Sequence, residues 1–195
     1  MITHIEGKLI EKTPTYAVID CAGVGYLLNI SLNTFSNLGA KDDKCKLFTH
    51  LSIREDAHVL FGFAKQEERS VFRHLISVSG VGPSTARMIL SSLSPMEIQQ
   101  AILTGNVNQL KSIKGIGEKS AQRIIVDLKG KLGKDDLASD FFMTTNNTVK
   151  DEALSALVML GFAKNSAEKA LEKALKIEGA SYSVELLIKT ALKNL

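Results

Sequence analysis

The chain has 195 residues, of which 45% are hydrophobic and 23% charged, and its formal net charge is +3. This composition is ordinary for a folded globular protein, and no apolar run approaches the roughly 20 residues of a membrane-spanning helix. The N-terminal sequence MITHIEGKLI lacks the apolar core of a signal peptide, so we expect a cytoplasmic protein. Cys21 and Cys45 show no metal-ligand spacing with the four histidines, and we expect no metal, no cofactor and no disulfide.

Residues 1–63 read as a β domain. They contain apolar, β-branched and aromatic runs that predict five strands, namely Ile2–Ile10, Tyr16–Cys21, Val24–Ile30, Lys46–Arg54 and His58–Phe63. Turn residues separate the runs, and a polar loop is expected at Asn33–Asp43. Five strands in about sixty residues predict a small closed barrel of the oligonucleotide-binding (OB) type, with a sandwich-like β domain as the alternative.

The turn Arg54-Glu55-Asp56-Ala57, which joins the last two predicted strands, carries two carboxylates. Acidic turn residues are most often simply solvated. If the segment that follows binds DNA, however, Glu55 and Asp56 would repel phosphates and hold neighbouring duplexes apart. The turn is therefore a candidate acidic pin.

Residues 64–132 contain a duplication. The stretch LISVSGVGPSTARMIL at 75–90 matches LKSIKGIGEKSAQRII at 110–125 with an offset of 35 residues. Each copy predicts a helix, a turn with two glycines, and a second helix, so the segment is a repeated supersecondary unit. The glycines are Gly80 and Gly82 in the first copy, and Gly115 and Gly117 in the second.

Such turns suit the binding of phosphate groups. Their backbone N–H groups and the positive end of the following helix face the same way, while a side chain on the glycines would block a phosphate. Val81 and Ile116 are apolar and would anchor the turns to the helices. The predicted DNA contacts are Gly80, Val81, Gly82, Pro83, Ser84, Gly115, Ile116, Gly117, Lys119, Ser120 and Arg123.

The charge distribution favours this interpretation over a plain helical bundle. Residues 64–131 carry ten Lys and Arg against five Asp and Glu, whereas the segments on either side each carry one excess negative charge. The whole positive excess therefore lies on the duplicated segment, as expected for contact with nucleic acid. A helix at Gln66–Ser77 and another from Ser94 to about Gly105 complete the helical domain.

The last third of the chain predicts a tether and a small bundle. Residues 133–147 lack any sustained period and predict a flexible linker, in which Phe141, Phe142 and Met143 could dock. Residues 148–195 predict three helices, near 149–160, 165–178 and 183–194. The expected core is Leu154, Leu157, Leu160, Leu171, Leu175, Leu187, Ala191 and Leu195. The turn Met159-Leu160-Gly161-Phe162 resembles bundles of the ubiquitin-associated type, and partner contacts are expected at Leu157, Met159, Phe162 and Leu187.

The fold class is thus α+β and multidomain: an OB-like barrel at 1–63, an all-helical domain at 64–132, a linker at 133–147 and a three-helix domain at 148–195. The duplicated domain resembles the tandem helix-hairpin-helix motif of sequence-independent DNA binders. In this order the parts resemble the RuvA family, the Holliday-junction-binding subunits of bacterial RuvAB branch-migration machines. The most specific stretches are REDAHVLFGF (54–63), GVGPSTA (80–86) and GIGEKSAQRIIVDLK (115–129).

The resemblance implies a non-catalytic homotetramer that binds a four-way junction, with a second tetramer possible on the other face. It places the acidic pin at the crossover, and it implies that the C-terminal domain recruits the hexameric ATPase RuvB. The resolvase RuvC is expected in the same complex. Ser84 and Glu118 stand where the family often has lysine, which removes two cations near the phosphates.

Other function classes fit the sequence less well. Gly117-Glu118-Lys119-Ser120 is similar to the end of a P-loop, but Ile113 and Glu118 stand where that motif needs glycine. A DNA glycosylase with a lyase activity would use a lysine placed like Lys119 and an aspartate about one helix further on. The candidates Asp135, Asp136 and Asp140 fall instead in the predicted linker.

A single-strand-binding module is the remaining alternative. It would present aromatic side chains on the barrel as a stacking platform. The candidates Tyr16, Tyr26 and Phe48 lie in the predicted strands, and we expect them to belong to the core.

Overall fold

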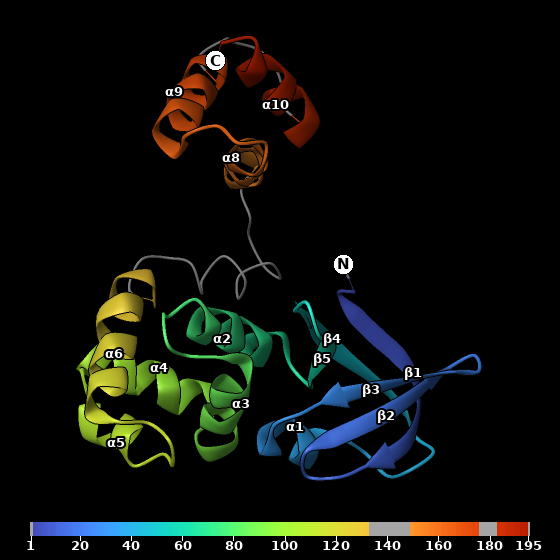
Figure 1. Ribbon diagram of the computed structural model, residues 1–195. Helices are drawn as coiled ribbons and strands as arrows, with labels where there is room; N and C mark the ends of the chain where they lie inside the picture. The colour runs from blue at the N-terminus through green and yellow to red at the C-terminus, as the bar shows by residue number, and fades with distance from the viewer. Residues whose placement is uncertain (1, 133–148, 176–182, 195) are drawn as a thin grey trace. The chain divides into compact units, whose positions relative to one another are not determined.

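A computed structural model describes residues 2–132, 149–175 and 183–194 (Figure 1). The chain divides into two compact units, residues 1–140 and 141–195, which are described separately below. The predicted linker with Phe141, Phe142 and Met143 lies outside the described residues, as does Leu195. None of the described helices is long and apolar enough to cross a membrane.

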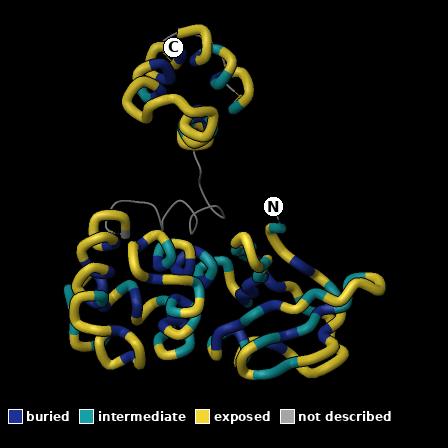
Figure 2. The backbone as a smooth tube through the Cα atoms, in the orientation of Figure 1, coloured by how far each residue is buried: buried dark blue, intermediate teal, exposed yellow. Residues whose placement is uncertain are grey.

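The N-terminal part is a closed five-stranded barrel, as predicted, and the sandwich alternative is wrong. Its strands are β1 (His4–Lys12), β2 (Tyr16–Cys21), β3 (Val24–Asn29), β4 (Lys44–Ile53) and β5 (His58–Phe63). They close in the order β1-β2-β3-β5-β4. Every pairing is antiparallel except that of β3 with β5, which meet at Asn29 and Phe61. Alternate residues of the strands point inward, which produces the buried stripes of the barrel in Figure 2.

The barrel is closed by large aliphatic side chains at its centre. Leu9, Ile19, Leu28 and Leu47 are fully buried there. Gly62 lies opposite two of them, and a Cβ at this position would come within 3.0 Å of the Leu28 and Leu47 side chains. A larger residue at 62 would therefore push these strands apart.

The expected polar loop at Asn33–Asp43 is partly wrong, because its first half is the helix α1 (Leu32–Asn37). Ser31 caps this helix: its side chain accepts a hydrogen bond from the Thr34 N–H at 3.0 Å. A helix of six residues is too short to show a hydrophobic period, which is why the pattern did not reveal it.

Between the barrel and residue 132 the structure has the helices α2 (Gln66–Ile76), α3 (Pro83–Ser92), α4 (Pro95–Thr104), α5 (Val107–Lys111) and α6 (Glu118–Leu132). The predicted start and end of α4 are confirmed. Ser94 and Glu97 form a reciprocal capping box, and Gly105 ends the helix with a φ of 71°. In α6 the side chains of Ala121, Ile124, Ile125 and Leu128 are buried.

The helical part shares its hydrophobic core with the barrel. Phe61 and Phe63 of β5 belong to the same buried cluster as α2, α3, α4 and α6. The Phe72 ring of α2 lies 5.1 Å from the Phe61 ring and 4.9 Å from the Phe63 ring, measured between centroids. Strand β5 thus joins barrel and helices into the unit 1–140.

The second unit contains α8 (Val149–Met159), α9 (Lys164–Leu175) and α10 (Val184–Leu192), close to the three predicted helices. Its core combines leucines with small residues: Ala153, Leu157, Ala167, Ala170, Leu171, Ala174, Leu187 and Ala191. Two expected core residues are wrong, since Leu160 is 62% exposed and Leu175 41% exposed. Both lie at helix ends, where alanines along the helix interfaces already fill the small core.

Candidate nucleic-acid interface

The two glycine turns have the same backbone geometry. Gly80 and Gly115 both have left-handed conformations, with φ of 89° and 87°. Each copy then closes with matching hydrogen bonds: Val81 N to Val78 O and Ile116 N to Ile113 O at 3.0 Å, and Ala86 N to Gly82 O and Ala121 N to Gly117 O at 2.9 Å. The repeat predicted from the sequence is therefore a repeat in three dimensions.

The second glycine of each turn has a different role from the first. Gly82 has a φ of −82° and a ψ of 169°, a conformation that any residue adopts. A Cβ added to Gly82 or Gly117 would meet nothing within 4 Å. The fold itself does not require glycine at these two positions, so the open surface there is available to something outside the chain.

The residues between the glycines anchor the turns. Val81 and Ile116 are each only 6% exposed, so only their backbone atoms could contact DNA. Beyond the turns, the first N–H groups of α3 and α6 have no acceptor within their own helix. These amides and the helix dipoles give each hairpin a site suited to a phosphate.

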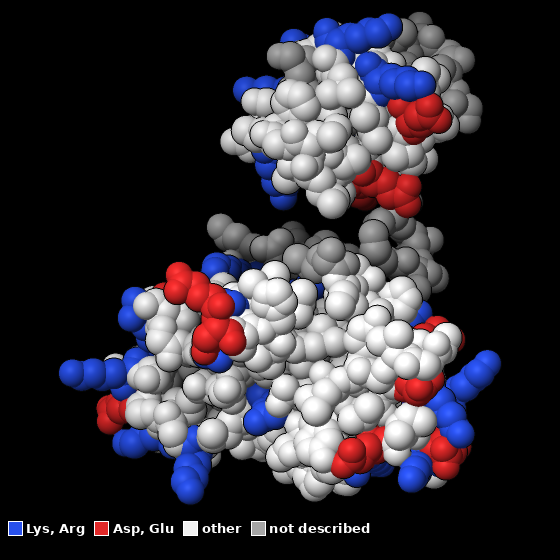
Figure 3. Space-filling view, turned by 45° about the vertical axis from the view of Figure 1, so that its right-hand side comes forward, with Lys and Arg blue, Asp and Glu red and all other residues white. Residues whose placement is uncertain are grey.

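The cations around the two turns are unequal. In the second copy Lys119 and Arg123 are exposed, with Arg123 Nε 3.8 Å from the Asp127 carboxylate. Glu118 forms an ion pair with Lys111 at 3.2 Å, which neutralises one lysine beside the turn. The first copy has the uncharged Ser84 in its first helical turn. Figure 3 shows Lys and Arg side chains projecting mainly from the lateral edges of the 1–140 unit.

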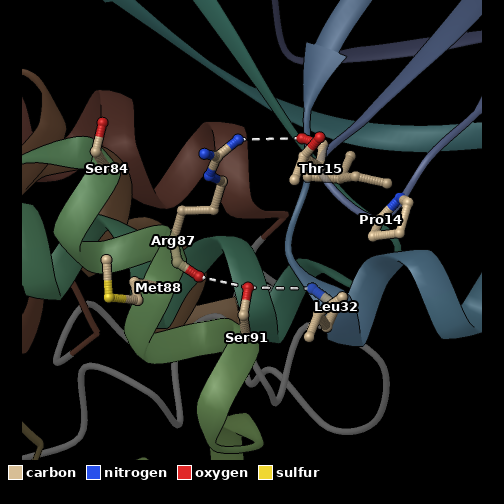
Figure 4. A pocket seen from close by; sticks show the side chains of 8 residues that line it. Pro14, Thr15, Leu32, Ser84, Arg87, Met88 and Ser91 are labelled. Atoms are coloured by element: carbon tan, nitrogen blue, oxygen red, sulfur yellow. Dashed lines mark hydrogen bonds between the residues drawn. The ribbon is translucent and has the colours of Figure 1, made fainter. Parts of the chain in front are cut away.

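Arg87, the arginine of α3, is directed at the barrel. Its Nη1 donates to the Thr15 carbonyl at 3.0 Å and to the Asn29 side chain at 2.9 Å. Beside these bonds α3 and the barrel leave an open pocket of about 310 Å³, seen in Figure 4. The pocket is lined by Pro14, Thr15, Ile30 and Leu32 from the barrel and by Ser84, Arg87, Met88 and Ser91 from α3. The contact of Arg87 with the barrel could not be predicted from the sequence, because no local pattern distinguishes Arg87 from a solvent-facing arginine.

The acidic turn lies at the tip of the β4–β5 hairpin. The Arg54 N–H donates to the Ala57 carbonyl at 2.9 Å, which closes the turn. Glu55 and Asp56 are both exposed. Asp56 forms an ion pair with Arg54 at 3.4 Å, whereas within the described part of the chain Glu55 has no ion pair. Repulsion of a phosphate would thus come mainly from Glu55.

The expected contact residues of the C-terminal unit separate into two groups. Met159 is 88% exposed and Phe162 36% exposed, so both are open to a partner. Leu157 and Leu187 are fully buried in the core of the bundle, so in this structure their side chains are not exposed to a partner. Leu160, expected in the core, instead extends the exposed apolar surface at the end of α8.

The structure also shows where the residues of the two alternative functions lie, the lyase and the single-strand-binding module. Lys119 is exposed at the start of α6, and the aspartates that a lyase would need, Asp135, Asp136 and Asp140, lie outside the described residues. Tyr26 packs partly against the barrel core and Phe48 partly against the helical core. Tyr16 is half-buried, and its hydroxyl donates to Glu11.

Family profiles match along most of the chain. Residues 1–62 match the RuvA N terminal domain, residues 72–130 a SAM-like helix-hairpin-helix tandem, and residues 148–195 the RuvA C-terminal domain. The order and approximate extent of these matches follow the barrel, the duplicated helices and the C-terminal bundle.

Full-length relatives agree with these matches. Proteins named Holliday junction branch migration complex subunit RuvA, from Christiangramia forsetii and Flavobacterium psychrophilum, are each 53% identical over 195 residues, which is 100% of both chains. The protein of that name from Bacteroides fragilis is 50% identical over 203 aligned positions, again covering 100% of both chains. With its barrel, its paired glycine turns and this similarity along its whole length, the chain belongs to the RuvA family.

Proposed function

We propose that this chain binds four-way (Holliday) junction DNA without reading its base sequence and serves as the DNA-binding subunit of a branch-migration complex. The observation that carries the proposal is the pair of turns with matching hydrogen bonds, each with an unobstructed second glycine. Both turns offer backbone N–H groups to phosphates, and such main-chain contacts carry no information about base sequence.

The residues proposed to contact DNA are those of the two turns and the helix starts that follow them. Gly80, Gly82, Pro83 and Ser84 act in the first hairpin, and Gly115, Gly117, Lys119, Ser120 and Arg123 in the second. Val81 and Ile116 contribute backbone atoms only, because their side chains are buried. Glu55 and Asp56 act at the crossover, where their negative charge keeps duplex arms apart.

The assembly in which this occurs is proposed as a homotetramer, with one hairpin pair for each arm of the junction and a second tetramer possible on the opposite face. The exposed Met159 and Phe162 would contact the ATPase RuvB, which supplies the energy for branch migration. The chain itself would carry out no catalysis, and RuvC would act on the same junction. The apolar surface at the end of α8 supports the partner contact, since exposed apolar groups at one end of a small bundle often mark a binding site.

A gel-shift comparison of a four-way junction with a linear duplex of the same sequence tests the function. The junction should bind more tightly, its affinity should be unchanged by base sequence, and it should fall steeply with salt. If a tetramer neutralises about 8 phosphates, the slope of log K against log salt concentration is roughly −7. Equal affinity for the linear duplex, or a flat salt response, would refute the proposal.

A second experiment addresses the lyase alternative. The full chain is incubated with abasic duplex DNA and then treated with borohydride, which traps any Schiff base formed by a lysine. We expect no covalent adduct. An adduct that disappears in Lys119→Gln would instead establish a lyase.

A further inference from the structure

Both helices of the first hairpin are hydrogen-bonded to one short segment of the barrel, residues 29–34, which we call the bracket. On α2, the Glu68 carboxylate is 3% exposed and accepts hydrogen bonds from the Ser31 and Thr34 hydroxyls, the latter at 2.7 Å. A buried carboxylate with two hydroxyl donors is a well-defined contact, because losing either donor leaves a buried charge less well satisfied.

On α3, three further residues of the bracket make contacts. Asn29 accepts a hydrogen bond from Arg87 at 2.9 Å, and the Leu32 N–H donates to Ser91 Oγ at 3.1 Å. The Asn33 side chain donates to the carbonyls of Leu90 and Leu93 at the end of the helix, at 2.5 and 3.0 Å. Because the open pocket lies beside these contacts, polar bonds rather than apolar packing set the spacing between α3 and the bracket on this side (Figure 4).

The second hairpin provides an internal comparison. Thirty-five residues after Arg87 and Ser91 the chain has Gln122 and Val126, on α6. Gln122 is exposed, Val126 is 75% exposed, and within the described residues neither has a hydrogen bond to the barrel. The duplicated hairpins are therefore alike in their turns but differ in this attachment.

The bracket also leads directly to the acidic pin. Asn29 pairs with Phe61 of β5, and β5 begins just after the turn that carries Glu55 and Asp56. The pin is thus continuous with β5, β5 pairs with the bracket at Asn29, and Asn29 is hydrogen-bonded to Arg87 of α3.

We propose that the bracket determines selectivity for the four-way junction over linear duplex, by holding the first hairpin in a fixed position relative to the pin. The proposal rests on the function proposed above. A linear duplex needs only the hairpins, whereas a junction must meet hairpins and pin at once. A loosened bracket therefore adds an ordering cost to junction binding alone.

The test uses the full chain with Asn29→Ala and Asn33→Ala combined. Neither substitution changes the net charge or touches a glycine turn, so an electrostatic effect on DNA binding is avoided. We expect the four-way junction to bind about tenfold more weakly, the linear duplex to bind as before, and the salt slope to be unchanged. Asn37→Ala is the matched control, since Asn37 lies on α1 like Asn33, but among the described residues its side chain bonds only to the Asn33 carbonyl within that helix.

The outcomes separate this proposal from the function on which it rests. If the unaltered chain shows no preference for the junction, the proposed function fails. If the unaltered chain prefers the junction, the bracket proposal fails when the double variant has the same ratio of junction to duplex affinity. This includes the case in which its affinities for both DNAs fall by the same factor. Should the double variant unfold, the single variant Ser91→Ala is measured instead. A fall of less than tenfold in the ratio of junction affinity to duplex affinity supports the proposal, and an unchanged ratio overturns it.

Discussion

At the scale of single residues, the four turn glycines divide into two that shape the chain and two that leave room for a ligand. Gly80 and Gly115 have positive φ values, which other residues adopt only with strain. Gly82 and Gly117 have space around them and no positive φ. The sequence shows all four glycines in the same motif. Only the backbone angles of the structure distinguish the two that require glycine from the two that do not.

Substitutions should separate these roles experimentally. Gly82→Val and Gly117→Val should weaken junction binding, because the side chain occupies the phosphate site, while the melting temperature changes little. Gly80→Ala should instead destabilise the fold by about 1–2 kcal/mol, because alanine is strained in the left-handed region. Thermal unfolding and gel shifts on the same preparations measure both effects. Normal DNA binding by the valine variants would show that the open glycines are not phosphate sites.

The proposed repulsion between the acidic pin and DNA can be tested by removing the charges of Glu55 and Asp56. Glu55→Gln combined with Asp56→Asn removes two negative charges and releases Arg54 from its ion pair. Junction affinity should therefore rise or hold, and the separation of strands at the crossover should change. A fluorescent base analogue at the crossover reports the separation, while gel shifts report affinity. A fall in affinity would contradict the repulsion on which the pin depends.

Glu68 links the stability of the 1–140 unit to pH. Burial raises the pKa of its carboxyl above the ordinary value of 4.5, and hydrogen bonds from Ser31, Thr34 and the Ala64 backbone oppose this without cancelling it. Between the ordinary value and the raised pKa, the folded chain keeps a proton that the unfolded chain has lost. Stability from this group is therefore present at lower pH and falls as pH rises through that window.

Removing the carboxyl should flatten this dependence. Glu68→Gln cannot ionise, so the difference in melting temperature between the unaltered chain and the variant should shift in favour of the variant as pH rises above about 4.5. The amide also loses an acceptor for one of the hydroxyls, which costs stability at every pH, so the slope rather than the absolute value is the test. Parallel pH profiles for the two proteins would show that Glu68 does not titrate as argued.

At the scale of elements, residues 110–131 of the second hairpin carry six Lys and Arg against two Asp and Glu, and Glu118 reduces this positive charge. Glu118→Lys should release Lys111 and change the local charge by two units. Junction affinity should rise, and the salt slope should steepen by about 1 for each new phosphate contact. Glu152→Lys on α8 makes the same charge change outside the hairpins and serves as the control. Equal gains from both substitutions would mean that net charge, rather than the hairpin, controls affinity.

Most of these elements could be predicted from the sequence because their signals are local. Strands β2 and β5 have the bounds that alternation and turn residues predict, and α4 begins and ends at its caps. Helix α1 was missed because six residues cannot show a period. Leu160 and Leu175 were assigned to the core because a helical pattern alone cannot tell which leucines a small alanine-rich core still needs.

The candidate site was predictable in its turns but not in its surroundings. Two glycine motifs at a fixed spacing identify both hairpins, and buried Val81 and Ile116 agree with the role expected of them. The contacts of Arg87 and Glu68 join residues 34 to 72 positions apart in the chain, and no local pattern encodes such pairings. They depend on how the barrel and the helices pack, which only the folded structure reveals.

At the scale of the whole molecule, barrel and hairpins form one unit. The cluster of buried residues that fills the helical part includes two phenylalanines of β5, and the bracket adds polar contacts on a second side. A small barrel and a small helical domain would each be marginal alone, and the shared core raises the buried area of both. Motion between pin and first hairpin is accordingly restricted by packing as well as by hydrogen bonds.

The C-terminal unit has a core of its own, and we expect it to recruit a partner rather than to bind DNA. Residues 132–195 carry one excess negative charge, while the positive excess lies wholly in residues 64–131. Deleting residues 134–195 should therefore leave junction binding nearly intact but abolish stimulation of an ATP-driven partner. Gel shifts and ATPase assays on the truncated and full chains measure the two effects. If the bundle instead stabilises the rest of the chain, truncation would lower the melting temperature and weaken junction binding together. Loss of junction binding in the truncated chain would therefore refute the proposal that the C-terminal unit only recruits a partner.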